Sequence, residues 1–260
     1  MFSIHAIAQH LSGKVLDKTT AKPIEYVNIG IPGKSIGTVC DANGNFNLRI
    51  DTNHLKDVLL FSCIGYKPVS YKISDLATSN LTIEMQEANY NLNEVVIKPK
   101  KIVEKILGIK TTKRSVEAGF KENKLGYEMG VMMKNKKLAY LKTVNINIAT
   151  CTYDTLFYRL NIYKPASNNT FENILKEPIY IKIAKDQVKE TISIDLKSKN
   201  IVIEGNFLVA IEHVKYLGTG GLMFCSALGH KTYFRMTSQG NWESISVAGV
   251  SISVVADVEK

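Results

Sequence analysis

The sequence predicts an all-β protein made of two consecutive β-sandwiches, the second larger than the first. Short runs of alternating apolar and polar residues recur through both halves, and clusters of Gly, Pro, Asn and Asp separate them. The chain has 260 residues, of which 45% are hydrophobic and 22% charged, enough for one or two globular domains. We expect a first sandwich over residues 10–97 and a second, jelly-roll-like sandwich over 125–260.

The first half contains eight predicted strands. Asp41–Asn45 is predicted to be a tight hairpin turn, because Asn and Gly accept the positive φ that such turns need. Leu59–Ile64 is almost entirely apolar, which predicts a central strand covered on both faces. The predicted strands are 12–17, 24–31, 35–40, 46–50, 59–64, 69–73, 81–85 and 95–97.

Residues 98–124 form a predicted basic junction with one short helix. The helix is expected to begin after Pro99, because four apolar residues then fall on one helical face: Ile102, Val103, Ile106 and Leu107. The rest of this segment is polar and is predicted to be a loop. Alternation returns in the second half, where clear strand patterns cover 144–148, 157–163, 192–196, 207–212 and 250–254.

Four blocks of the first half resemble a known family, in both order and spacing. They are Ser12–Val15, Lys22–Ile29, Gly37–Phe46 and Leu60–Tyr66. This series resembles the carboxypeptidase-regulatory-like domain of the Bacteroidetes, a transthyretin-like sandwich. The resemblance implies an accessory domain that holds no catalytic residue. Segments 158–163, 174–177 and 205–212 look like the C-terminal part of Bacteroidetes proteins with the same arrangement, a part without an assigned activity.

The net charge of +9 is concentrated in the middle of the chain. Residues 98–142 hold 13 basic and 4 acidic residues. Proteins that bind nucleic acid usually spread such charge over a folded face with aromatic residues between, so we expect no nucleic-acid partner. Two interpretations stay open: a solvated junction, or a contact with an acidic polysaccharide, lipid headgroups or protein. The longest run without a charged residue, Tyr216–His230, predicts no transmembrane segment, since a spanning helix needs about 20 mostly apolar residues.

The first residues predict export. Ala6-Ile7-Ala8 has the small-x-small pattern that signal peptidase recognises, so residues 1–9 are interpreted as a signal-peptide remnant. The alternative is an ordinary frayed terminus. We therefore expect an exported protein, in the periplasm or on the cell surface.

Four cysteines are present, and none forms a Cys-x-x-Cys pair. Their disulfide state stays open, since four cysteines allow three connectivities, although buried free thiols are favoured. The residues are Cys40, Cys63, Cys151 and Cys225.

The sequence predicts no catalytic residue, metal or cofactor. His54–Asp57 is the only His-x-x-acid pair, and it falls in a predicted hairpin rather than in an enzyme cleft. Leu217–Gly221 lacks the Lys-Ser/Thr ending of a phosphate loop, and there is no Gly-x-Ser-x-Gly motif. Spacing alone does not exclude two carboxylates that converge from distant strands.

One group of residues predicts ligand binding. Tyr233, Arg235 and Trp242 cluster near the C-terminus, and exposed aromatic rings beside an arginine suit sugar recognition. The alternative is that Trp242 closes the core of the second sandwich. The function expected is a non-catalytic structural or protein-interaction module of the cell envelope, or else a carbohydrate-binding module. Its partner would be an envelope protein or a surface glycan.

Overall fold

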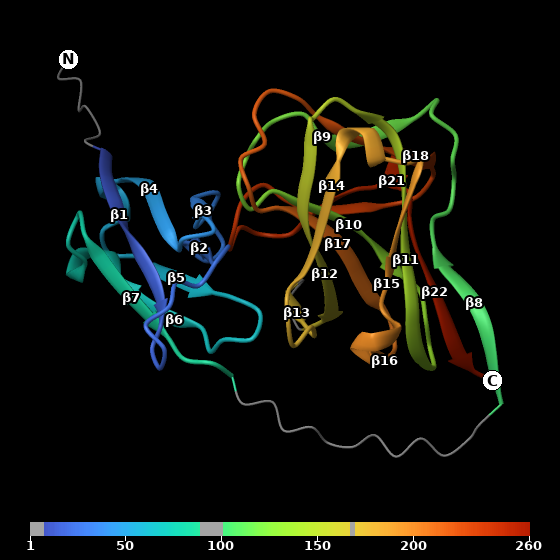
Figure 1. Cartoon of the computed structure of the whole chain (residues 1–260), viewed down its shortest axis with the longest axis horizontal. Coiled ribbons are helices and arrows are strands. Elements are labelled where there is room, and N and C mark those ends of the chain that lie inside the picture. The colour runs from blue at the N-terminus through green and yellow to red at the C-terminus, as the bar shows by residue number, and fades with distance from the viewer. Residues whose placement is uncertain (1–7, 89–100, 167–169) are drawn as a thin grey trace. The chain divides into compact units, whose positions relative to one another are not determined.

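The computed structural model describes residues 8–88, 101–166 and 170–260, and it confirms the all-β fold class (Figure 1). The described residues form two compact units. The first contains those of 1–89 together with 124–127 and 235–241, and the second contains the remainder. Every helix among the described residues is a single 3-10 turn, and none is long and apolar enough to cross a membrane. These turns are η1 (Thr52–His54), η2 (Ile73–Asp75), η3 (Lys185–Gln187) and η4 (Lys197–Lys199).

The first unit contains two sheets. One has the strand order β4-β1-β7, with β1 and β7 parallel, and the other has the order β3-β2-β5-β6. The alternation predicted for Phe46, Leu48 and Ile50 is confirmed, because these side chains are buried and their neighbours in β4 are exposed. The strands are β1 (Ala8–Asp17), β2 (Asn28–Gly30), β3 (Gly37–Val39), β4 (Asn45–Asp51), β5 (Val58–Ser62), β6 (Val69–Lys72) and β7 (Leu81–Met85).

Two expectations for this unit were wrong. Asp41–Asn45 is a turn, with Gly44 at φ +75° and Asp41 Oδ1 accepting from the N–H groups of Asn43 and Asn45. It is not a hairpin, however, because β3 pairs with β2 whereas β4 pairs with β1 in the other sheet. Strand β5 is not fully covered on both faces: Leu59 and Phe61 are buried, whereas Leu60 on the other face is only half-buried and Val58 is exposed.

The second unit contains two larger sheets. One has seven strands in the order β13-β12-β17-β10-β19-β20, with β14 also paired to β12. The other has eight, in the order β21-β18-β11-β22-β8, with β15 and β16 paired to β11 and β9 paired to β18. Their bounds are β8 (Ile102–Gly108), β9 (Glu117–Phe120), β10 (Glu128–Met133), β11 (Leu138–Cys151), β12 (Thr155–Pro165), β13 (Phe171–Asn173), β14 (Ile179–Ala184), β15 (Thr191–Asp195), β16 (Val202–Glu204), β17 (Phe207–His213), β18 (Leu222–Leu228), β19 (Thr232–Arg235), β20 (Glu243–Ile245), β21 (Ala248–Val250) and β22 (Ile252–Glu259).

The helix predicted in the junction is also wrong. Ile102–Gly108 is strand β8, and it lies antiparallel beside β22 without a break in register (Figure 1). The apolar pairs Ile102-Val103 and Ile106-Leu107 fit a helical face, yet an isolated helix of this length is marginal in water. Pairing with β22 instead satisfies the backbone N–H and C=O groups of the segment that face β22. Part of the predicted loop is likewise a strand, because β9 pairs with β18.

Aromatic side chains fill the space between the two sheets of the second unit. The ring of Phe120 in β9 contacts Tyr158 in β12 at a centroid distance of 5.1 Å and Phe224 in β18 at 5.8 Å. His213 packs against Tyr158 at 5.1 Å. The face of β12 that carries Tyr158 is therefore the core face, and Arg159, Asn161 and Tyr163 lie on the opposite face.

Two predicted segments fall at or outside the ends of the described ranges. Most of the predicted signal-peptide remnant lies outside the described residues, but Ala8 and Gln9 already belong to β1. The predicted strand at 95–97 lies outside the described residues as well.

Candidate binding surface

A pocket of about 780 Å³ opens at the end of β8 in the second unit. Most of its wall is apolar, and the pocket is large enough to hold several amino-acid or sugar units. It is lined by Ile106, Leu107, Gly108, Ile109, Val131, Met132, Lys134, Pro165, Asn206, Gly229, His230, Lys231 and Tyr233.

The polar part of this pocket is basic. Lys134, His230 and Lys231 are exposed, and no carboxylate lines the pocket in the described part of the chain. The ammonium group of Lys231 lies 5.6 Å from the ring centroid of Tyr233, a cation–π distance that holds the lysine stem over the ring. The pocket therefore favours an anionic group close to an apolar one.

Three exposed aliphatic side chains lie beside the pocket, and we call them the apolar rim: Leu228, Ile245 and Val247. Their exposed fractions are 66%, 51% and 67%. The backbones beside the rim are hydrogen-bonded to one another: the N–H of Gly229 donates to the carbonyl of Val247 at 3.0 Å. Ile245 lies opposite Thr232. The rim thus flanks the pocket segment 229–231.

The three residues predicted to bind ligand have different surroundings in the structure. Tyr233 lines the pocket, and its ring contacts Phe171 at 5.9 Å. Trp242 is half-buried against the same Phe171, at 5.2 Å. Arg235 is the last residue of β19 and is buried, so its side chain is less exposed than those of Tyr233 and Trp242.

Sequence reasoning missed the rings that join Tyr233 to Trp242. Tyr163 lies 5.5 Å from Trp242 and 6.4 Å from Phe171, so four aromatic side chains form one cluster on the face of the sheet opposite its core. Strand alternation placed Tyr163 on a face, but only the register between β12 and β13 brings Phe171 beside it.

A buried polar network lies on the same sheet face. Glu212 Oε2 accepts from Arg159 Nη2 at 2.7 Å and from Asn161 Nδ2 at 2.8 Å. The Asn161 amide also donates to Glu128 Oε1 at 2.7 Å, and Tyr163 donates to Glu128 at 2.9 Å. Both carboxylates have no exposed surface. The two carboxylates come from strands that are distant in the sequence, as a hydrolytic pair could. In this conformation a substrate could not reach them, so they hold the packed side chains of the sheet together through hydrogen bonds.

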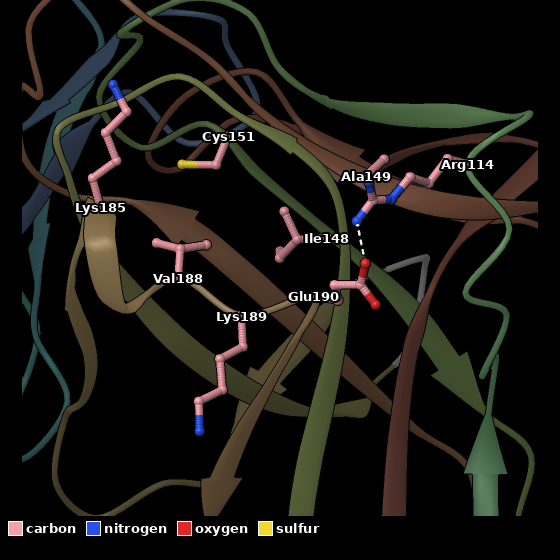
Figure 2. A pocket seen from close by; sticks show the side chains of 8 residues that line it. All are labelled: Arg114, Ile148, Ala149, Cys151, Lys185, Val188, Lys189 and Glu190. Carbon is pink, nitrogen blue, oxygen red and sulfur yellow. Dashed lines mark hydrogen bonds and ion pairs between the residues drawn. The ribbon is translucent and has the colours of Figure 1, made fainter.

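A second pocket, of about 200 Å³, lies over β11 of the second unit (Figure 2). Figure 2 shows Arg114 reaching Glu190, with Cys151 at the other end of the pocket and Lys189 extending away from it. Burial raises the pKa of the Cys151 thiol, which keeps it protonated at neutral pH. No histidine from the described ranges lines the pocket to act as the base of this thiol.

The His54–Asp57 pair is an ion-pair cluster. Asp57 Oδ2 accepts from Lys34 Nζ at 2.5 Å and from His54 Nδ1 at 2.7 Å, and these two hydrogen bonds lower the pKa of the Asp57 carboxyl. A lysine ammonium occupies the place a metal ion would need. Among the described residues no group of three His, Cys, Asp or Glu side chains is arranged to hold a metal. None of the four cysteines, all of which the structure describes, forms a disulfide, and Cys40 and Cys225 are buried.

Comparison with known proteins identifies the first unit. The model of the CarboxypepD_reg-like domain family matches residues 11–97. Over 96 residues the chain is 29% identical to the TonB-dependent receptor SusC of Bacteroides thetaiotaomicron, an alignment that covers 36% of this chain and 9% of SusC. The chain thus spans about a tenth of the length of that curated relative.

Two solved structures align along most of the chain at low similarity. One is described as a candidate carbohydrate binding protein from Bacteroides uniformis, with 12% identity, a TM-score of 0.24, and coverage of 96% of this chain and 98% of that one. The other is BcpA*(D312A), the major pilin subunit of Bacillus cereus, with 11% identity, a TM-score of 0.19, and coverage of 96% and 69%. The family match over the first unit confirms the resemblance seen in the sequence, and this protein is one that carries a CarboxypepD_reg-like domain at residues 11–97.

Proposed function

We propose that this chain is a non-catalytic, exported protein of the cell envelope that acts as a structural or protein-interaction module. The observation that supports the proposal best is the apolar rim beside the pocket of the second unit. Three large aliphatic side chains, each more than half exposed, lie there on neighbouring backbone segments. Exposed aliphatic groups gathered in one place are typical of protein interaction sites, whereas single ones are ordinary on a protein surface.

The chemistry of the described residues supports a binding role rather than a catalytic one. The two carboxylates that converge are buried, the half-buried thiol has no base in its pocket, and the His54–Asp57 pair is held by Lys34. The family match and the SusC relative support a place in the envelope, since SusC is a TonB-dependent receptor.

The proposal is tested with a double variant, Leu228→Ser with Val247→Ser. Immobilised chain is exposed to solubilised envelope proteins, and the bound proteins are compared with those bound by wild type. We expect the double variant to lose proteins that wild type retains, because the rim no longer buries apolar surface. The matched control is Val58→Ser, which removes an exposed valine from the first unit and should retain them. Equal retention by the double variant would contradict a docking role for the rim.

A carbohydrate-binding role is the second candidate, and the position of Tyr233 supports it. This ring lines the pocket together with Asn206 and Lys231, a combination of stacking face and hydrogen-bonding groups suited to a sugar. A glycan array distinguishes the two functions. If the pocket binds sugar, Tyr233→Ala should abolish the signal, while Tyr71→Ala, at an exposed tyrosine of the first unit, should not change it.

A further inference from the structure

Strand β8 ends the eight-stranded sheet of the second unit. Among the strands that the structure describes, it pairs with β22 alone. Hydrogen bonds at both of its ends show which backbone groups face β22. The N–H of Ile109 donates to the carbonyl of Ile252 at 2.9 Å, and the N–H of Lys260 donates to the carbonyl of Lys101 at 2.8 Å.

The other backbone groups of β8 face away from the sheet. In an antiparallel ladder, residues that bond to the partner strand alternate with residues that do not. Lys101 and Ile109 bond to β22, and the register between them is unbroken, so every second residue from 101 to 109 does so as well. The N–H and C=O groups of Ile102, Glu104 and Ile106 therefore point outward along the edge.

The side chains on this edge do not oppose pairing. Natural edge strands are usually protected by a charged side chain that would be buried by an incoming strand. β8 carries two charges, Glu104 and Lys105. Glu104 is already paired with Lys142 Nζ at 2.6 Å, and Lys142 also reaches Asp257 at 3.3 Å. Lys105 is exposed, and its cation opposes a basic incoming segment but favours an acidic one. On either side of Glu104, Ile102 and Ile106 are 53% and 54% exposed. The edge thus presents hydrogen-bonding groups between two exposed isoleucines.

The basic pocket lies at one end of the same edge. Four consecutive residues, 106–109, line the pocket. Because neighbouring residues of a strand point to opposite faces of the sheet, the pocket borders the edge of the strand rather than one face of it. A segment that paired along the outer edge of β8 would reach Lys134 and Lys231 at this end. Among the described residues that line the pocket there is no carboxylate to neutralise these cations, so they favour a negative charge on the incoming segment.

We propose that β8 accepts an extended, acidic segment of a partner protein, which adds to the sheet as a further strand. Apolar side chains of that segment pack against Ile102 and Ile106, and a carboxylate lies near Lys134 and Lys231. The inference rests on the proposed interaction function and names its partner chemistry. A second copy of the chain fits less well, because symmetric pairing about Glu104 sets two glutamates opposite one another.

The test compares two variants at one position. Glu104→Ala and Glu104→Pro both remove the carboxylate and its pair with Lys142, but only proline also removes the outward N–H. That N–H does not bond to β22, so proline at this position leaves the ladder intact, and circular dichroism should show both variants folded. Any difference in binding between the two variants therefore reports on the backbone of the edge.

The probe is a phage-displayed library of random peptides, selected on the full wild-type chain. We expect the selected peptides to alternate apolar residues and to carry Asp or Glu. The peptides should bind Glu104→Ala within about twofold of wild type and Glu104→Pro at least about tenfold more weakly, a factor that corresponds to about 1.4 kcal/mol. Hydrogen exchange at the amides of Ile102 and Ile106 should slow when peptide is bound. Lys231→Gln should weaken binding and reduce its dependence on salt.

Three results would overturn the inference: no selected peptide above background, equal peptide binding by the alanine and proline variants, or no added protection of the outward amides. None of these overturns the interaction function itself, because the envelope proteins lost by the Leu228→Ser and Val247→Ser double variant are measured separately. Failure of that variant to lose them, with a positive glycan array, would instead reject the proposed function.

Discussion

Replacing Arg159 by methionine removes the cation that bonds to a fully buried carboxylate. Arg159 Nη2 and Nε lie 2.7 Å and 3.0 Å from Glu212 Oε2, and Glu212 has no exposed surface. Methionine keeps much of the volume but none of the charge. Breaking a buried ion pair by removing one partner costs about 3–5 kcal/mol, because the remaining charge stays desolvated.

The measurement is unfolding by urea, followed by fluorescence. Trp242 is the single tryptophan and belongs to the second unit, so its signal reports the unfolding of that unit. In a thermal scan, each 1 kcal/mol shifts the melting temperature of a domain of this size by about 2–4 °C, so we expect Arg159→Met to lower it by about 6–20 °C.

Two controls separate burial from the ion pair as such. Arg114→Met makes the same substitution at an exposed pair, in which Arg114 lies 2.8 Å from Glu190, and it should cost less than about 1 kcal/mol. Adding Glu212→Leu to Arg159→Met removes the stranded charge and should recover part of the loss. The reasoning is refuted if Arg159→Met costs no more than Arg114→Met.

Three further predictions follow from particular contacts. Burial lowers the pKa of His213 from its ordinary value of 6.5 to about 4. The second unit should therefore keep its stability above pH 6.5 and lose up to about 3 kcal/mol as the pH falls toward 4. His213→Gln, followed by Trp242 fluorescence, should flatten this dependence, and an unchanged slope would contradict it. Gly44→Ala should destabilise the first unit by about 1–2 kcal/mol, because φ is +75° and a Cβ would lie 2.5 Å from the Val15 carbonyl oxygen. Hydrogen exchange in β4 should become faster, and an unchanged rate would count against this prediction. Limited trypsin digestion should spare the bond after Lys105, which lies in β8 opposite Ala256, and mass spectrometry of the fragments would expose early cleavage there.

The sequence by itself determined the fold class and the family of the first unit. Alternation places Phe46, Leu48 and Ile50 on one face wherever the partner strand lies, because side chains on a strand point to opposite faces in turn. The blocks that carry the family resemblance are local as well: each is a turn or strand recognisable from consecutive residues, as in Asp41–Asn45 with Gly44 at positive φ.

The tertiary structure decided every feature that depends on pairing between distant residues. Ile102–Gly108 carries apolar pairs that suit a helix or a strand, and only β22, about 150 residues later in the chain, selects the strand. The same pairing fixes which backbone groups of β8 face outward. Likewise, Tyr233 meets Trp242 through Phe171, and Glu212 meets Arg159 and Asn161, through registers between strands that lie far apart in sequence. Local pattern holds no information on register between remote strands, so the binding surface and the buried network could be located only in the folded chain.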